Sequence, residues 1–253
     1  MKEPAKSGLD LLAEVESTQK SGVTLWWLGH CGFIVKSHDI VFYVDPCLTA
    51  GAPLEPALAA NADMILCTHS GPKHMHPETL TGMLAASPRA KVVMPKSAAE
   101  HAHALGIPFH RMTTTDSDLR VEYFKLGQYG RVYSVPSAHP ELDYTPSGGY
   151  PHLGYLIRFG GLTVYHAGDC RMYDGLADRL RPYNVTAALL PIDGNGNFEV
   201  PEAAQLAEDI GARWLIPMHH GGLADHFVDH MLGFRPGIGF KVFEPGERWT
   251  IPD

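Results

Sequence analysis

Short apolar runs, separated by glycine, aspartate or proline, dominate the first part of the chain. Residues 23–29 (VTLWWLG), 32–37 (GFIVKS) and 40–46 (IVFYVDP) are rich in β-branched and aromatic side chains, as strands usually are. Residues 62–69 (ADMILCTH) form another run of this kind, which ends in a stretch rich in histidine. We therefore predict consecutive strands at these positions.

Helical patterns follow the fourth run. The residues from about Pro77 to Ala86 favour a helix, and the strand-like run 90–95 (AKVVMP) comes after it. Residues 96–106 (KSAAEHAHALG) combine helix-forming side chains with a terminal glycine, which predicts a second helix. The runs 119–127 and 131–139 then predict a hairpin.

The second half repeats this style. Residues 153–169 (LGYLIRFGGLTVYHAGD) predict a strand, a Gly-Gly turn and a second strand, and 185–193 (VTAALLPID) predict a buried strand. Residues 200–212 form an amphipathic helical pattern, and the strand-like run 213–220 (RWLIPMHH) follows. Residues 240–253 (FKVFEPGERWTIPD) predict one last hairpin.

Strands and helices in both halves predict an α/β protein in which two β-sheets pack face to face and are covered by helices. We predict a single domain over residues 1–253, with residues 1–22 as an N-terminal helical extension. Charged residues interrupt the apolar stripe of that extension, so it predicts a docked helix and not an export signal.

Composition narrows the function classes. The formal net charge of −8 disfavours nucleic acid and anionic membranes as partners, because both attract cationic surfaces. No apolar run approaches the roughly 20 residues that span a bilayer. Four scattered cysteines without a CxxC pair predict reduced thiols in a cytoplasmic protein. We expect a small-molecule substrate as the partner; the oligomeric state does not follow from the sequence.

Polar side chains recur where the predicted strands end. The residues concerned are His69, His74, His76, His139, Asp169 and His219. Imidazoles and a carboxylate gathered from several elements suit a divalent metal, which activates a bound water. Each histidine taken alone is more often a hydrogen-bonded structural residue, and Asp169 also suits a turn. The repetition of the same residue types at four strand ends favours a shared metal site.

The segments WWLGHCGFIVKS, YVDP, THSGPKH, LGYLIRFGGLTVYHAGD and IPMHHG follow one another in an order that resembles the metallo-β-lactamase superfamily. They resemble most closely its branch containing L-ascorbate-6-phosphate lactonase, from about Val23 to Pro252. The resemblance implies a four-layer αβ/βα sandwich, with two mixed β-sheets flanked by helices. It also implies a site for one or two metal ions where the sheets meet.

The histidine-rich loop departs from the family motif H-x-H-x-D-H. The motif begins at His69 and ends at His74, but Gly71 replaces its middle histidine and Lys73 replaces its aspartate. The ammonium group of a lysine is a cation without a lone pair, so it competes with a metal.

The resemblance implies His69, His139 and Asp169 as ligands of the first metal. It implies His74, Asp169 and His219 as ligands of the second. Each set lacks one ligand, so we expect at most one tightly held divalent metal per chain, either zinc or manganese.

Three further residues each allow two interpretations. Lys73 either lies in the pocket, where a deprotonated amine would act as a ligand or base, or is solvated on a rebuilt loop. Asp45 either orients a metal ligand or ends a strand in a turn. His76 either restores an imidazole to the site or caps the helix at Pro77.

Weaker candidates complete the set. His30 is expected to support the site from behind its ligands, and Asp193 to shape the pocket floor. His101, His103 and His110 are expected at the surface.

The preferred function is a metal-dependent hydrolase that opens a lactone or ester-like bond of a small molecule through a metal-activated water. Asp169 orients that water, and Asp45 and Lys73 are the other candidate catalytic residues. One alternative is a degenerate, metal-free or metal-poor protein that binds a small ligand. Another is a phosphodiesterase on the same scaffold, because one fold hosts many reactions.

Overall fold

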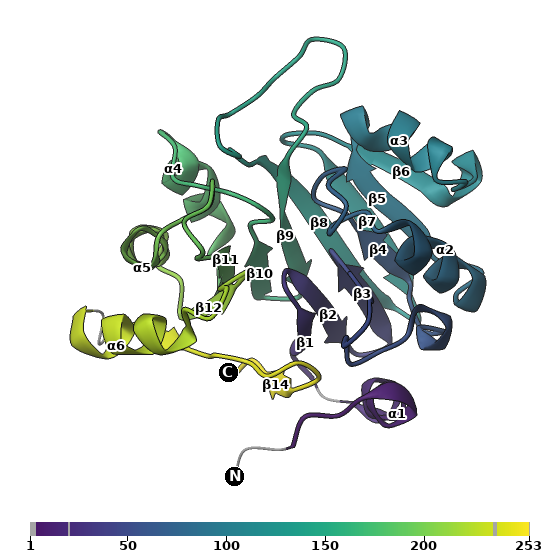
Figure 1. The fold of residues 1–253 in the computed structure, drawn as a ribbon, viewed down its shortest axis with the longest axis horizontal. Coiled ribbons are helices and arrows are strands. Elements are labelled where there is room, and N and C mark those ends of the chain that lie inside the picture. The colour runs from purple at the N-terminus through teal and green to yellow at the C-terminus, as the bar shows by residue number, and fades with distance from the viewer. Residues whose placement is uncertain (1–3, 20, 235–236, 253) are drawn as a thin grey trace. The chain divides into compact units, whose positions relative to one another are not determined.

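The computed structural model describes residues 4–19, 21–234 and 237–252. They divide into two compact units, and each unit is described by itself. The first comprises the described parts of Met1–Thr115, Tyr123–Gly130 and Phe243–Asp253, and the second comprises Asp116–Glu122 and Arg131–Val242. Figure 1 labels the elements named below.

The first sheet is mixed. Its spatial order is β14 (Arg248–Thr250), β1 (Thr24–Gly29), β2 (Gly32–Ser37), β3 (Ile40–Val44), β4 (Met64–Leu66), β5 (Lys91–Pro95) and β6 (Met112–Thr115). Neighbours from β14 to β3 are antiparallel, and those from β3 to β6 are parallel. Every residue of β2 and β3 is buried, which explains why these strands appear as continuous apolar runs.

Three α-helices belong to the first unit among the described residues. They are α1 (Gly8–Ser17), α2 (Pro77–Ala86) and α3 (Ala99–Ala104), accompanied by the 3₁₀ turns η1 (Pro56–Leu58), η2 (Lys96–Ala98) and η3 (Phe109–Arg111). Leu11, Leu80 and Ala102, one from each helix, share a single apolar core with Trp26 of β1 and Ile34 of β2. In Figure 1, α2 and α3 lie on the same side of β4 and β5. The predicted helix at 77–86 is thus confirmed, and the helix predicted at 96–106 forms as the 3₁₀ turn η2 followed by α3.

The second sheet is also mixed. Its order is β13 (Gly239–Phe240), β12 (Trp214–Met218), β11 (Ala187–Pro191), β10 (Leu162–His166), β9 (Leu153–Phe159), β8 (Gln128–Pro136) and β7 (Arg120–Lys125). Neighbours from β13 to β10 are parallel, whereas β10, β9 and β8 pair antiparallel. Parallel pairing points the carboxyl ends of β10, β11 and β12 the same way, so the polar residues after them gather at one edge of this sheet.

The helices of the second unit are α4 (Leu176–Leu180), α5 (Val200–Asp209) and α6 (Ala224–Phe234), with the turn η4 (Arg181–Tyr183). A reciprocal capping box between Glu199 and Glu202 begins α5, and Pro201 occupies its first turn. The helix buries an apolar stripe that includes Ala203 and Leu206, and it contacts β11 and β12. The loop between β11 and α5 is thereby held at both ends.

The predicted C-terminal hairpin is wrong. A turn does form at Pro245 and Gly246, where the Glu247 amide donates to the Glu244 carbonyl at 2.9 Å. The flanking strands, however, do not pair with each other: β13 pairs with β12 in the second sheet, and β14 pairs with β1 in the first. Open strand edges elsewhere in the chain compete successfully with the local partner, and a turn signal cannot reveal that competition.

The described residues therefore form two mixed β-sheets flanked by helices, as the sequence predicted. Within the same residues, no helix has both the length and the hydropathy that crossing a membrane requires.

Candidate metal centre

The loop between β4 and α2 carries two of the predicted ligands, His69 and His74. Both side chains are buried. The amides of His74 and Met75 donate to the carbonyl of Gly71, at 2.9 and 2.8 Å, and so fold the loop into a turn. The two imidazole centroids lie 3.9 Å apart, with their planes inclined by 40°. The turn thus brings two imidazoles into contact although five positions separate them in the sequence.

A buried carboxylate, Asp45, supports His74 from the end of β3. Asp45 Oδ2 lies 2.7 Å from His74 Nδ1. Thr68 donates from its backbone N–H to Oδ1 at 2.8 Å and from its hydroxyl to Oδ2 at 2.6 Å. These bonds replace the water that a fully buried carboxylate would otherwise need. Metal-binding histidines are commonly held in this way, with one ring nitrogen on a carboxylate and the other directed at the metal.

Gly71 leaves room that the His69 ring fills. A Cβ atom built on Gly71 would lie 2.5 Å from His69 Nε2 and 2.8 Å from its Cδ2, closer than real atoms approach. A histidine therefore does not fit at position 71 while His69 keeps this orientation. The absence of a side chain at position 71 and the placement of the His69 ring are thus linked.

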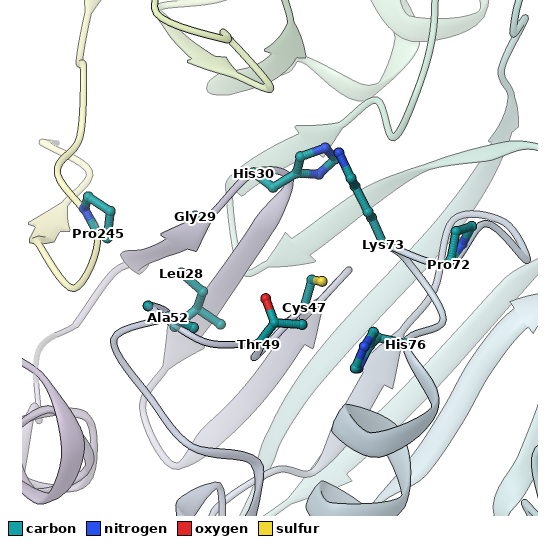
Figure 2. Close-up of a pocket in the computed structure, with 11 residues that line it drawn as sticks. Leu28, Gly29, His30, Cys47, Thr49, Ala52, Pro72, Lys73, His76 and Pro245 are labelled. Atoms are coloured by element: carbon teal, nitrogen blue, oxygen red, sulfur yellow. The ribbon is translucent and has the colours of Figure 1, made fainter.

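Lys73 and His76 both line a cavity beside this loop, as Figure 2 shows. The Lys73 side chain is exposed, so it contacts solvent as well as forming part of the cavity wall. His76 is the N-cap of α2, because its Nδ1 accepts a hydrogen bond from the Thr79 amide at 3.3 Å. Of its two readings, helix capping is the one that the geometry shows.

His30 and Cys31 form a second histidine-containing group with His74. One ligand atom from each of the three lies within 4.8 Å of the others. The His30 ring meets the His74 ring edge-on, with a centroid separation of 5.6 Å. His30 thus packs behind a predicted ligand. Cys31 was not singled out in the sequence, although its position beside His30 at a glycine-flanked turn was a usable signal.

In the second unit, His139 and Asp169 lie close together. His139 Nε2 is 3.9 Å from Asp169 Oδ2, and the Asp169 side chain is nearly buried. On the other side of the ring, His139 Nδ1 lies 2.9 Å from the carbonyl oxygen of Gly196. Gly196 has a φ of +76°, and a Cβ there would lie 2.9 Å from His139 Cε1. A side chain at position 196 would therefore displace the imidazole.

His219 follows β12 and is held by Asp193, which follows β11. His219 Nδ1 lies 2.8 Å from Asp193 Oδ2, and Asn197 donates to the other oxygen of Asp193 at 2.9 Å. The Asn197 side-chain oxygen in turn accepts from the Cys170 amide at 2.9 Å. Burial, and the neighbouring His219, lower the pKa of His220, so this second imidazole favours its neutral form.

The donor set suits a borderline-soft divalent cation. Three of the predicted histidines, His74, His139 and His219, have Nδ1 engaged by a carboxylate or a carbonyl oxygen. This engagement fixes the ring so that Nε2 is the nitrogen presented to a metal. Imidazole nitrogens with one carboxylate are ligands that zinc and manganese accept. The first unit groups His69 with His74, and the second groups His139 with Asp169. The convergence of His69, Asp169 and His219 stays a prediction.

Three supporting residues escaped the sequence reasoning. Thr68 lies between a predicted strand and the histidine-rich loop, and Gly196 lies in a glycine-rich loop. Neither position indicates a supporting role from the sequence alone. Asp193 was noted as a floor residue and not as the partner of His219. All three act through hydrogen bonds or close contacts that only the folded chain creates.

The expectation of surface positions for three further histidines is confirmed. His101, His103 and His110 are exposed. The four cysteines are free thiols, and three of them are buried.

The family described as "Beta-lactamase superfamily domain" matches residues 24–219, which is most of the chain. A "UPF0173 metal-dependent hydrolase" from Pyrococcus furiosus is 29% identical over 234 residues, which cover 89% of this chain and 98% of the relative. A relative of the same description from Methanosarcina barkeri is 27% identical over 201 residues, covering 79% of this chain and 84% of the relative.

A solved structure with the same fold is the metallo-β-lactamase fold protein YhfI from Bacillus subtilis. Its TM-score is 0.68 at 15% identity, and the match covers 90% of this chain and 98% of that one. At this identity the likeness shows the fold alone. Together with the family match over residues 24–219, it places the chain in the metallo-β-lactamase superfamily.

Proposed function

We propose that the protein is a metal-dependent hydrolase that cleaves a lactone or ester-like bond of a small molecule. One observation carries the proposal: His74, His139 and His219 each have Nδ1 engaged by Asp45, the Gly196 carbonyl or Asp193. A hydrogen-bond partner on one ring nitrogen is what a histidine needs to present the other to a metal. The relatives named as metal-dependent hydrolases support the same reading.

The residues we assign as ligands are His69, His74, His139, Asp169 and His219. A bound divalent cation, zinc or manganese, supplies Lewis acidity and makes a water nucleophilic near neutral pH. Because Gly71 and Lys73 remove two motif ligands, we propose one tightly held ion per chain.

The side chains themselves have distinct tasks. Asp169 is a ligand and accepts a hydrogen bond from the attacking water, which orients that water. Asp45 holds the His74 ring from behind, and Asp193 does the same for His219. Lys73 lines the neighbouring cavity as an exposed side chain, and we assign it to substrate binding and not to proton transfer.

We propose a lactone or ester-like bond as the target because the WWLG, YH-x-GD and IP-x-HH segments resemble those of the lactonase-containing branch. We place the protein in the cytoplasm, because its four cysteines are free thiols. The degenerate ligand-binding alternative draws on the same two replaced motif residues, Gly71 and Lys73, so the experiment has to separate the two functions.

The test compares wild type with Asp169→Ala on a panel of lactones and carboxylic esters, assayed with added zinc or manganese. Wild type should hydrolyse at least one member, and Asp169→Ala should lose that turnover while its unfolding temperature without metal stays close to that of wild type. Asp174→Ala is the matched control, since Asp174 is an exposed aspartate nearby in the sequence.

Two outcomes would redirect the assignment. Cleavage of bis(p-nitrophenyl) phosphate, with no turnover of any lactone or ester, would establish the phosphodiesterase. If wild type bound no metal and hydrolysed nothing, and Asp169→Ala behaved identically, the ligand-binding protein would replace the hydrolase.

A further inference from the structure

A cavity of about 530 Å³ opens beside the histidine loop, within the first unit (Figure 2). Small-molecule sites usually measure about 300 to 1,000 Å³, so the space suits a compact organic ligand. His30 lines the cavity and packs edge-on against His74, so one side chain separates the cavity from a proposed metal ligand. The cavity thus lies where part of a substrate would extend.

The wall of the cavity is mostly apolar. Its apolar side chains are Leu28, Ala52, Pro72 and Pro245. None of its described lining residues is acidic. A ligand would therefore gain most of its contact energy from apolar surface, and a carboxylate would meet no like charge on the wall.

Lys73 is the only lysine or arginine among the described residues that line this wall. Figure 2 shows its side chain pointing toward the part of the cavity where His30 lies. No carboxylate in the described part of the chain forms a salt bridge with Lys73, so its charge is not already neutralised there by an ion pair. A cation on a mostly apolar wall complements a ligand with one anionic end.

We propose that this cavity binds a small monocarboxylate, with the carboxylate at Lys73 and a compact apolar body against Leu28, Ala52 and Pro245. A single lysine matches a single charge, whereas a phosphate group generally recruits several cations or an arginine fork. The inference rests on the proposed function in one respect: it names the substrate class as carboxylate-bearing lactones or esters. Binding to the cavity itself does not require the metal.

Cys47 provides a reporter inside the cavity. It lines the wall, and it is half-buried, whereas Cys31, Cys67 and Cys170 are buried. An alkylating reagent should therefore reach Cys47 first, and a ligand in the cavity should shield it. Burial raises the pKa of the Cys47 thiol, so labelling at pH 8 is slow enough to follow.

The experiment measures iodoacetamide labelling of Cys47 in the full chain, treated with a chelator, against rising hexanoate, hexan-1-ol or hexyl phosphate. Hexanoate should protect Cys47 in a saturable manner, and hexan-1-ol should protect it much less. Lys73→Gln should weaken hexanoate binding roughly tenfold, because a hydrogen bond to a charged group is lost. Lys73→Arg should recover most of it. Lys96→Gln, at an exposed lysine outside the cavity, is the matched control.

Equal protection by hexanoate and hexan-1-ol would overturn the proposal, as would unchanged hexanoate binding in Lys73→Gln. Tighter binding of hexyl phosphate than of hexanoate would overturn the carboxylate assignment. All of these measurements use metal-free protein, so their failure is distinguishable from failure of the hydrolase, which appears only in metal content and turnover.

Discussion

At Gly71, the absence of a side chain leaves the space that the His69 ring occupies. The His69 ring stands over Gly71, and a Cβ there would come within 2.5 Å of His69 Nε2. The motif expected from the sequence has a histidine at this position, and the His69 ring occupies space that such a side chain would need.

Gly71→Ala should therefore displace the His69 ring and lower metal affinity, on the order of tenfold, as changes to supporting residues commonly do. Competition against a chromophoric chelator measures the affinity. Gly161→Ala is the control, because its φ is not positive and a Cβ there meets nothing within 4 Å. Equal affinity in wild type and Gly71→Ala would show that metal affinity does not depend on the position of the His69 ring over residue 71.

The thiols give a prediction that does not involve metal. Burial raises the pKa of the Cys170 thiol to about 12, and it raises the pKa of Cys67 as well. Native protein at pH 8 should therefore be alkylated at Cys47 alone, whereas unfolded protein should be labelled at all four cysteines. Peptide mass spectrometry identifies the sites, and native labelling of Cys170 as fast as Cys47 would contradict the buried assignment.

The raised pKa of the Cys170 thiol also predicts how the stability of the protein depends on pH. A thiol whose pKa is raised by folding stays protonated in the native protein after the unfolded chain has ionised. Its contribution to stability is complete below pH 9, and it is lost as the pH rises from about 9 toward 12.

At this scale, the sequence could indicate candidate metal ligands but not how their side chains are held. His69 and His74 were visible because their residue type and position at a strand end mark them. Their supports were not visible, because the contact of Thr68 with Asp45 spans 23 positions and that of Gly196 with His139 spans 57. Such contacts depend on the tertiary fold and leave no local pattern.

Among the elements, most strands and helices could be predicted from local signals. The helix Pro77–Ala86 begins at a proline, and the hairpin of β9 and β10 turns at a Gly-Gly pair, so local residues mark both elements. The C-terminal segment could not be predicted, because β13 and β14 are two and three residues long and pair with strands distant in the sequence. Short strands take their structure from their partners.

A buried aromatic side chain, Phe243, anchors the segment before β14. Phe243 is 5% exposed and packs edge-to-face against Phe33 and Trp249. Phe243→Ala should reduce the free energy of unfolding by about 3 to 5 kcal/mol, as for other buried phenylalanines. Phe109→Ala is the control, since Phe109 is 70% exposed and should cost about 0.5 kcal/mol or less. Urea unfolding compares them, and equal losses would mean that Phe243 is not a core residue.

At the scale of the whole molecule, the superfamily is established, whereas the chemistry rests on the proposed metal centre. The match over residues 24–219 and the two helix-flanked sheets establish the superfamily. Gly71 and Lys73, the two replaced positions of the motif expected from the sequence, bear instead on the number of metal ions, for which we propose one per chain. The metal count is therefore the quantity on which the hydrolase assignment depends.

Elemental analysis of protein purified without added metal and dialysed measures that count most directly. Wild type should retain about one equivalent of zinc or manganese per chain. Asp169→Ala should retain far less, and His101→Ala, at an exposed histidine, should match wild type. A metal-free wild type, or two equivalents that survive dialysis, would contradict the proposed centre.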